Sequence, residues 1–421
     1  MRRVKLMIIV AALLSCKFVL AQHTYSPFTV VGIGELNGMG MSHNTAMGGV
    51  GIANPTVWHI NLMNPALLPY NSLTVFEIGV EGENRKISNN LGKVKVGTAG
   101  FKYLNFAFPI IPAKWTSSIG LMPYSTVNYS FTVTSDIAGT VTDSQVLFEG
   151  IGGLNQVFFS NGVNVFEGFN VGLRMSYIFG LIEETTNTQL IGGNLSQQFP
   201  TGYLSKTDYN GFNFGFGMAY KKVLNENNNL NFGLTFDLAS EINGSRFERN
   251  QYLNALGNIV PGDTIVTNLT DQFKLPSEIG FGVSWRKINK MNIGLDIKRS
   301  IWNENAGFGN DAETFVSTWS IGLGMELTPK YNDVNNYLKR IKYRLGLEFK
   351  QLPYEVNNNT INDFGINFGT SLPIKGVSAL NLSFKYGQRG TIAQTLVKEQ
   401  YLKFVLGATI NDRWFVRRKY N

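Results

Sequence analysis

The sequence contains a single cysteine, Cys16, so the chain cannot form an internal disulfide bond. Histidine is almost as scarce, and His23, His43 and His59 all lie near the N-terminus. A catalytic dyad of the Ser/His or Cys/His type therefore cannot be built from the residues that follow His59. We predict that the protein is not an enzyme.

The few histidines also bear on metal and cofactor binding. Their spacing is irregular, and neither a second cysteine nor a pair of carboxylates accompanies them. This pattern predicts no metal site. The glycine clusters form no phosphate-binding motif either, because "GGVGIA" is not followed by lysine and then serine or threonine. We therefore expect no cofactor.

Charged residues are few as well, at 16% of the chain, and the formal net charge is +8. Four of the positive charges, Arg2, Arg3, Lys5 and Lys17, lie at the extreme N-terminus, and +8 less these four is +4. The other lysines and arginines are scattered and form no basic stripe with interleaved aromatic residues. Nucleic-acid binding is therefore excluded as a function.

No stretch of the chain approaches the ~20 consecutive apolar residues that a membrane-spanning helix needs. The N-terminus instead has a basic start, a short apolar stretch and small residues before Gln22. These features predict a secretory signal peptide over residues 1–21. An alternative interpretation treats "LLSC" as a lipobox in which Cys16 is acylated.

What the chain has in abundance is alternation of apolar and polar residues. Between residues 230 and 238 every second residue is Leu or Phe, and the residues between them are Asn, Gly, Thr and Asp. Runs of this kind often exceed the length of strands in soluble sandwiches. They predict about fourteen strands, near residues 72–82, 94–108, 115–135, 145–163, 168–183, 204–221, 229–242, 271–287, 291–302, 313–328, 340–352, 362–373, 378–388 and 400–412.

Glycine recurs on the polar face of these predicted strands. The positions are Gly172, Gly215, Gly217, Gly282, Gly322, Gly324, Gly346, Gly365, Gly369 and Gly407. Glycine weakens a strand, but it allows another backbone to approach closely. We therefore predict that the polar face looks inward onto another part of the chain.

The connections between the predicted strands alternate between short ones and longer polar ones such as 184–203 and 243–270. Short periplasmic turns and long extracellular loops are typical of outer-membrane barrels. The predicted fold is all-β: a transmembrane antiparallel β-barrel of about fourteen strands over residues 71–415. Residues 22–70 would form an N-terminal hatch plugging the lumen, and residues 416–421 a periplasmic tail.

The third predicted strand, residues 115–135, contains Pro123. Apolar residues occupy odd positions on both sides of the proline, so we predict one long strand. Because proline donates no ladder hydrogen bond, the wall is locally unpaired or bulged there. One interpretation is a tolerated bulge. The other is a lateral gap through which an apolar ligand could leave the lumen for the bilayer.

Several segments together carry a resemblance to a known family: "AMGGVGIA", "NPALL", "MPYSTVNYSF", "GGLNQV" and "FVLGATINDRWFVRRKY". The chain resembles the FadL-type long-chain fatty acid transporter superfamily of outer-membrane proteins, especially its branch in Bacteroidetes-like bacteria. The resemblance implies a fourteen-stranded barrel, a small N-terminal hatch and a third strand whose kink opens sideways. That branch also includes proteins that serve secretion, such as the PorV-type shuttle protein.

The first functional hypothesis is passive uptake of a hydrophobic, fatty-acid-like small molecule across the outer membrane. Asn64, Pro65 and Ala66 would be the hinge or anchor of the hatch, and Pro123 the defect in the wall. Partition into the bilayer supplies about 0.8 kcal/mol per buried methylene, so the passage needs no cofactor.

The second hypothesis is a non-transporting barrel subunit of an envelope or secretion machine. Residues 243–270 or 329–339 would then contact a protein partner, and membrane lipids would surround the barrel in either case. A continuous apolar cavity from the loops to Pro123 would favour transport. A lumen filled by the hatch and by wall side chains, together with an exposed apolar loop tip, would favour the partner role.

Overall fold

The computed structural model describes residues 25–137, 143–192, 200–254, 259–303, 308, 314–374, 377–395 and 397–413. The predicted signal peptide with Cys16, the residue His23 and the predicted tail 416–421 lie outside the described residues. Within the described ranges, no helix is long and apolar enough to cross a membrane.

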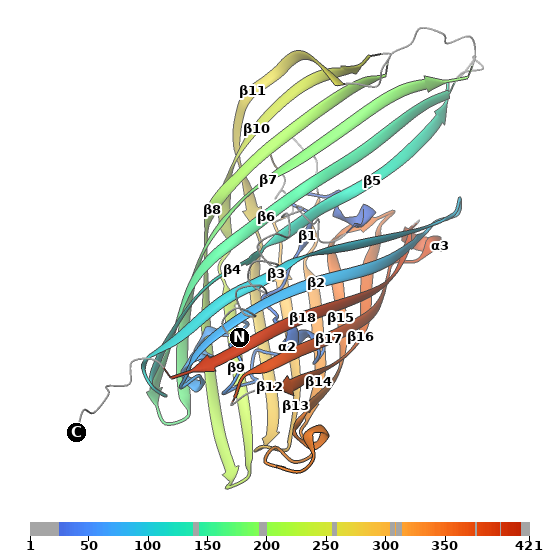
Figure 1. The fold of residues 1–421 in the computed structure, drawn as a ribbon. Coiled ribbons are helices and arrows are strands. Elements are labelled where there is room, and N and C mark those ends of the chain that lie inside the picture. Colours follow the sequence, from blue (N-terminus) through green and yellow to red (C-terminus); the bar gives the residue numbers. More distant parts are fainter. Residues whose placement is uncertain are drawn as a thin grey trace, which may run out of the picture.

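Antiparallel strands make up most of the described chain and form one tilted sheet (Figure 1). The strands are β1 (Glu35–Leu36), β2 (Thr74–Ser88), β3 (Lys93–Ile111), β4 (Trp115–Pro123), β5 (Ser125–Asp136), β6 (Asp143–Phe166), β7 (Phe169–Ile191), β8 (Thr201–Asn225), β9 (Asn228–Asp237), β10 (Ser240–Leu253), β11 (Ile259–Leu275), β12 (Ser277–Lys287), β13 (Met291–Ile301), β14 (Thr318–Leu327), β15 (Lys342–Val356), β16 (Asn359–Pro373), β17 (Ala379–Arg389) and β18 (Lys398–Asp412). The short helices are η1 (Pro27–Thr29), α2 (Ser42–Thr45), η2 (Pro65–Tyr70), η3 (Tyr337–Arg340) and α3 (Ile392–Thr395).

The sheet closes on itself because β18 pairs with β2 from Lys398 opposite Ser88 to Asp412 opposite Thr74. We call one crossing of the barrel wall a span. Three of the spans consist of two consecutive strands each, and the others of one. β4 and β5 both pair with β6, β9 and β10 both pair with β8, and β11 and β12 follow one another directly. The seventeen described strands from β2 to β18 therefore form fourteen spans. The predicted fourteen-stranded antiparallel barrel is confirmed.

The prediction that residues 184–203 and 243–270 are loops is wrong for most of their length. β7 continues to Ile191, β8 begins at Thr201, and β10 pairs with β11 over nearly the whole of the second stretch. These strands rise above the rest of the barrel in Figure 1. Their residues are largely polar on both faces because a strand beyond the bilayer needs no apolar face. The alternation is lost, but the backbone still pairs with its neighbours.

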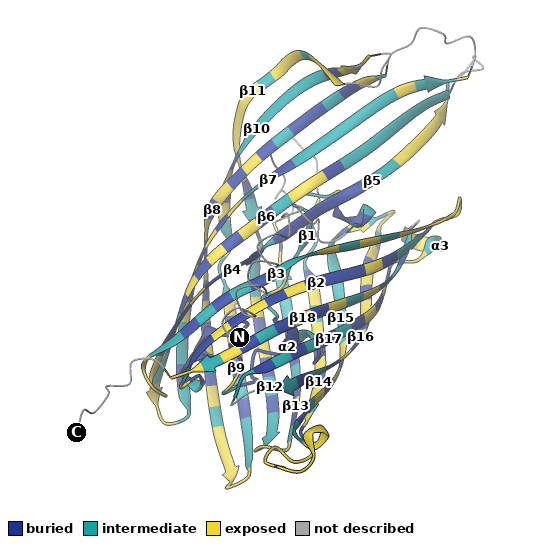
Figure 2. Cartoon of the chain, viewed as in Figure 1, coloured by how far each residue is buried: buried dark blue, intermediate teal, exposed yellow. Residues whose placement is uncertain are grey.

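The outer face of the wall carries large apolar side chains at every second position. Along β8, Phe212, Phe214, Phe216 and Met218 are 38–50% exposed, and the residues between them face inward. Figure 2 shows this alternation as yellow and blue bands along the strands. The same pattern on β7, β14 and β16 makes a belt much larger than the apolar patches of soluble monomers. Such a belt fits contact with lipid tails.

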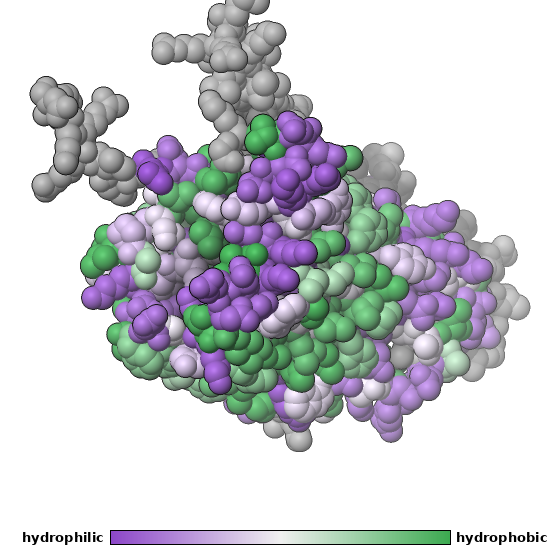
Figure 3. Space-filling view, turned by 90° about the horizontal axis from the view of Figure 1, so that it is seen from below, coloured by the Kyte–Doolittle hydropathy of each residue, from purple (hydrophilic) through white to green (hydrophobic). Residues whose placement is uncertain are grey.

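Residues 25–73, here called the inner segment, lie against the inner face of the wall and include η1, β1, α2 and η2. Their apolar side chains are buried although the segment has little regular structure. Large examples are Met41, Met47, Ile52, Leu62 and Leu68, each at most 2% exposed. No single apolar face is visible in the sequence because the segment is covered on all sides. Seen from below, packed side chains fill the end of the barrel where described atoms are drawn (Figure 3).

Candidate functional site

The first predicted site residues, Asn64, Pro65 and Ala66, lie at the start of η2. The Asn64 carboxamide oxygen accepts a hydrogen bond from the Ala66 backbone N–H at 3.0 Å, which caps the helix. Pro65 occupies the first helical position, where a missing N–H costs nothing. The Asn64 amide group donates to the carbonyls of Ile52, at 2.8 Å, and Met218, at 3.0 Å. Asn64 thus joins two parts of the inner segment to β8.

The wall glycines are aligned across neighbouring strands. Gly162, Gly172 and Gly217 stand opposite one another on β6, β7 and β8, as do Gly233 and Gly282 on β9 and β12, and Gly294, Gly324 and Gly346 on β13, β14 and β15. A row of glycines leaves a shallow track without side chains on the inner face. We call these three rows the glycine tracks.

The backbone of the inner segment lies in the glycine tracks. A Cβ atom added at Gly172 would come within 2.7 Å of the Pro65 carbonyl oxygen, and one at Gly346 within 2.7 Å of the Gly48 Cα. The middle track receives Ile52 and Ala53 in the same way. Of the ten glycines singled out in the sequence, four instead have wall side chains as nearest neighbours, namely Gly215, Gly282, Gly365 and Gly407, and Gly217 has the Asn64 side chain. The backbone of the inner segment comes close enough to require glycine at Gly172, Gly322, Gly324 and Gly346, and Gly369 faces the Leu382 carbonyl oxygen of the wall.

Polar wall side chains hold the same stretch of the inner segment. The Asp296 carboxylate accepts hydrogen bonds from the backbone N–H groups of Gly51, at 2.6 Å, and Ile52, at 2.8 Å. Ser284 donates its hydroxyl to the Ala53 carbonyl oxygen at 2.6 Å. These partners satisfy backbone groups that would otherwise be buried without one, because the segment has no ladder of its own there.

A buried ion cluster holds β1. The Arg389 guanidinium donates to both carboxylate oxygens of Glu35, at 2.8 and 2.7 Å, and to Asp363 at 2.8 Å. Glu399 accepts from Ser26 at 2.5 Å and is also paired with Arg85. Burial raises the pKa of Glu35, but the charge of Arg389 outweighs it and holds that pKa well below the usual 4.5. Glu35 is therefore ionised at neutral pH.

The other predicted site residue, Pro123, is the last residue of β4. It lies at a break in the third span, which consists of β4 and β5. Pro123 stands opposite Asn155, whereas Val127 stands opposite Gly152, so the third span contains one residue more than β6 over this stretch. The extra residue is a bulge. Gly152 and Gly153 have φ angles of +119° and +138°, a conformation that favours glycine.

The bulge reverses the two faces of the third span. Ile119, before the break, is 46% exposed on the outer face, whereas Val127 and Tyr129, after it, are buried in the interior. The prediction of one long strand with a single apolar face is therefore wrong. Apolar residues occupy odd positions on both sides of Pro123, although they face outward before the break and inward after it. The one extra residue of the bulge causes this exchange of faces.

The wall is interrupted laterally at the same place. β3 pairs with β4 up to Leu104 opposite Leu121, and β5 has β6 and β1 as its partners. The inner segment occupies the edge of β5 instead of β3. Glu35 and Leu36 pair with β5, and the Asn37 N–H donates to the Tyr124 carbonyl oxygen at 2.8 Å. The break in the wall is thus covered by a strand of the inner segment.

An apolar cluster lies behind this cover. Its buried members are Ile33, Val127, Tyr129, Leu154, Ile178, Ile182, Tyr209, Ile242, Phe273, Leu275, Trp302, Phe308 and Phe315. The aromatic rings pack edge to face or stacked, for example Trp302 on Phe315 at 4.7 Å between ring centres. Side chains therefore fill the upper lumen here. A hollow of about 360 Å³ lies on the outer side of β16 and β17, beside α3.

The structure does not bring the four predicted site residues together. Pro65 faces Gly162, which stands opposite Thr116 on β4. Pro123 lies seven residues further along the same strand, or about 23 Å. No sequence pattern predicted the ion pair between Glu35 and Arg389, because nothing in either neighbourhood specifies a contact across so long a separation. Residues 64–66 thus form an anchor of the inner segment, and Pro123 marks a break in the wall.

Comparison with solved structures identifies the fold. The CymD monoaromatic hydrocarbon channel is 14% identical, with 92% of this chain and 99% of that chain covered and a TM-score of 0.57. The toluene transporter TodX of Pseudomonas putida is 15% identical, with coverages of 90% and 99% and a TM-score of 0.58. A Pseudomonas aeruginosa FadL homologue is 12% identical, with coverages of 90% and 100% and a TM-score of 0.55. The barrel therefore has the FadL-type fold.

Comparison with families and curated proteins gives two further results. A family model described as BamG matches residues 3–421. No match was found among curated proteins.

Proposed function

The chain belongs to the BamG family. From this and from the side chains packed in the lumen, we propose that the protein is a non-transporting subunit of a larger envelope machine. It is an outer-membrane β-barrel whose N-terminal hatch is a fixed part of the wall. The close fit of the hatch backbone in the glycine tracks is the observation that carries this proposal.

Transport through the lumen would require the inner segment to move. Its contacts with the wall are distributed along its length rather than concentrated at one end, from Ser26 on β5 to Asn64 on β8. Each hydrogen bond contributes only about 0.5–1.5 kcal/mol net, but buried groups left without a partner cost more. A segment that satisfies buried wall groups at so many points is expected to stay in place.

The turn between β14 and β15 supports a protein partner. Tyr331, Val334 and Leu338 are 55%, 90% and 63% exposed on this turn, beside the basic residues Lys339 and Arg340. The turn lies at the same end of the barrel as the end of β18, which is the periplasmic end in the predicted orientation. Exposed apolar side chains at a turn outside the lipid belt fit contact with another protein. We assign this turn as the partner surface, in place of the 243–270 stretch.

Native mass spectrometry of the protein purified from its own membrane tests the proposal. We expect protein subunits to co-purify in a fixed ratio. The variant Val334→Asp/Leu338→Asp should lose them, because two carboxylates replace the apolar contact. Leu91→Asp is the matched control, since Leu91 is 95% exposed on a turn at the opposite end of the barrel. A protein that is recovered only with lipid-like ligands, or whose partners survive the turn variant, would refute the proposal.

The break beside Pro123 supports a second candidate function, sideways passage of hydrophobic, fatty-acid-like molecules into the bilayer. The upper part of β3 and the β5 edge are not paired with one another, and an apolar cluster lies behind them. Uptake of a radiolabelled long-chain fatty acid by cells carrying Pro123→Ala, compared with wild type, tests this function. A change in uptake would support it, and equal uptake would exclude the break as a gate.

A further inference from the structure

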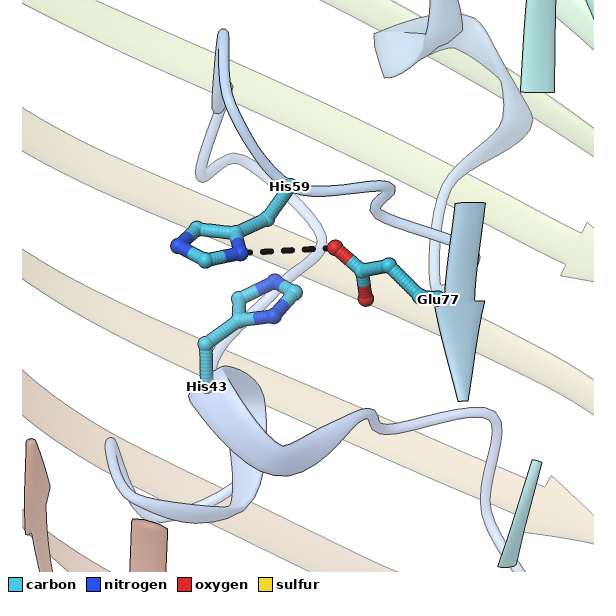
Figure 4. Close-up of side chains that lie close together, drawn as sticks. All are labelled: His43, His59 and Glu77. Atoms are coloured by element: carbon cyan, nitrogen blue, oxygen red, sulfur yellow. Dashed lines mark hydrogen bonds and ion pairs between the residues drawn. The ribbon is translucent and has the colours of Figure 1, made fainter. Parts of the chain in front are cut away.

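Two histidines of the inner segment and one wall carboxylate meet in the interior of the barrel (Figure 4). His43 comes from α2, His59 from the irregular stretch before η2, and Glu77 from β2. All three side chains are buried, with at most 2% of each residue exposed. The imidazole rings are stacked with their centres 4.8 Å apart. One nitrogen or oxygen atom from each residue lies within 4.8 Å of the other two.

The hydrogen bonds in this cluster are incomplete. Among the described residues, neither ring nitrogen of His43 has a hydrogen-bond partner, and the Glu77 Oε2 atom has none. Glu77 Oε1, in contrast, accepts from the Ile60 N–H at 3.1 Å and from the Thr409 hydroxyl at 3.0 Å. A buried polar group without a partner destabilises the fold. An imidazole with two such atoms, next to an open carboxylate oxygen, therefore needs a further ligand.

We propose that His43, His59 and Glu77 bind a divalent transition-metal ion, with zinc as the best fit, which fastens the inner segment to the wall. Two imidazole nitrogens and one carboxylate oxygen are a donor set that zinc uses. The proposal goes beyond the subunit function and does not depend on it.

The distance between His59 and Glu77 agrees with this assignment. His59 Nδ1 and Glu77 Oε1 are 3.3 Å apart. Two ligands at about 2.1 Å from one tetrahedral ion are separated by about 3.4 Å. The ligand atoms lie within 4.8 Å of one another, so the His43 ring has to approach by up to about 1.4 Å to complete the site. The Thr409 hydroxyl, 3.1 Å from His59 Nδ1, is placed to orient the ligands from β18.

A hydrogen-bonded pair without metal accounts for only part of the cluster. An N–H···O bond from His59 to Glu77 explains that contact, but it gives His43 no partner. A single metal ion between them gives a binding partner to both histidines and to Glu77.

Metal content tests the proposal directly. The full-length protein is purified in detergent, incubated with zinc sulfate, passed over a chelating resin and analysed by elemental mass spectrometry. We expect about one zinc ion per chain in the wild type and less than about a tenth of that in His43→Ala and Glu77→Gln. Ser42→Ala is the matched control, because it changes the neighbouring buried residue of α2 without removing a ligand, and it should retain the ion.

A second readout separates binding from misfolding. A chelator should lower the thermal unfolding midpoint of the wild type and of Ser42→Ala, but not that of His43→Ala. If His43→Ala fails to fold, the wild type and Glu77→Gln decide the result. Wild-type protein that retains no zinc above the level of an unrelated barrel, or variants that retain as much as the wild type, would overturn the proposal.

Discussion

Alanine at two of the wall glycines should loosen the inner segment without breaking the barrel. Gly172 and Gly346 lie in different glycine tracks and face different parts of the inner segment. An added methyl group would meet backbone atoms at 2.7 Å or less at each site, whereas ordinary contacts are 3.4–4 Å. The opposing backbone must therefore retreat by about 0.7 Å or more, and it cannot rotate away as a side chain can.

The free-energy cost of the two substitutions is that of overpacking. Overfilling a packed interior costs about 1–3 kcal/mol per site. The two sites share no contact, so the double variant should lose about 2–6 kcal/mol of segment docking. Glycine to alanine within a strand is otherwise slightly stabilising, because glycine loses more conformational entropy on folding. A loss of stability of the docked segment therefore indicates a clash, whereas a small gain would indicate only the higher strand propensity of alanine.

Hydrogen exchange of peptides from residues 25–73, measured by mass spectrometry, is the assay. Each single variant should speed exchange by about 5- to 150-fold, which corresponds to 1–3 kcal/mol of lost protection. Gly38→Ala is the control, since a Cβ there has no neighbour within 4 Å. Exchange of the inner segment that equals the wild type in both glycine variants would refute the close packing of the two backbones.

Three further predictions concern the anchors of the inner segment. Asn64→Ala removes the cap of η2 and the hydrogen bond to the Met218 carbonyl, so the thermal unfolding midpoint should fall by an amount equivalent to about 1–3 kcal/mol; an unchanged midpoint would contradict the anchor role. Glu35→Gln weakens the pairing with Arg389, and we expect faster exchange around β1 but not at η2. Because the folded-state pKa of Glu35 is lowered, its stabilisation is present above about pH 4.5 and is lost as the pH falls through the folded-state value. Acid should therefore speed exchange at β1 in the wild type more than in Glu35→Gln, and equal acid sensitivity would argue against the ion pair.

The barrel could be predicted from the sequence because membrane and lumen impose opposite demands on alternate residues. Residues 230–238 show the pattern, and residues 230–237 form the outer and inner faces of β9. The same logic fails beyond the bilayer, where β10 and β11 have polar residues on both faces and were predicted as a loop. The assignment of the polar-face glycines to close backbone approach is confirmed at positions such as Gly172 and Gly346, but not at Gly215 and Gly365, where wall side chains are the nearest neighbours.

The finer features of the site depend on contacts that single-sequence patterns do not encode. Pro123 marked the break, but the bulge that exchanges the faces is set by the register between the third span and β6. His43 and His59 gave no metal signal because the third ligand, Glu77, comes from the wall and reads in sequence as an ordinary lumenal carboxylate. The contact of Glu35 with Arg389 likewise arises only when the barrel closes.

A reversible lock between the inner segment and the wall tests the central claim most directly. Leu36 and Ser125 are paired residues on β1 and β5. Antiparallel partners have Cα atoms about 4.5–5.5 Å apart, within the range that a disulfide accepts. The double variant Leu36→Cys/Ser125→Cys should form the bond, and each single variant serves as a control. If the inner segment is a fixed part of the wall, the oxidised double variant will retain its protein partners and support growth as well as the reduced form does. Loss of either on oxidation, with recovery on reduction, would show that the segment must move.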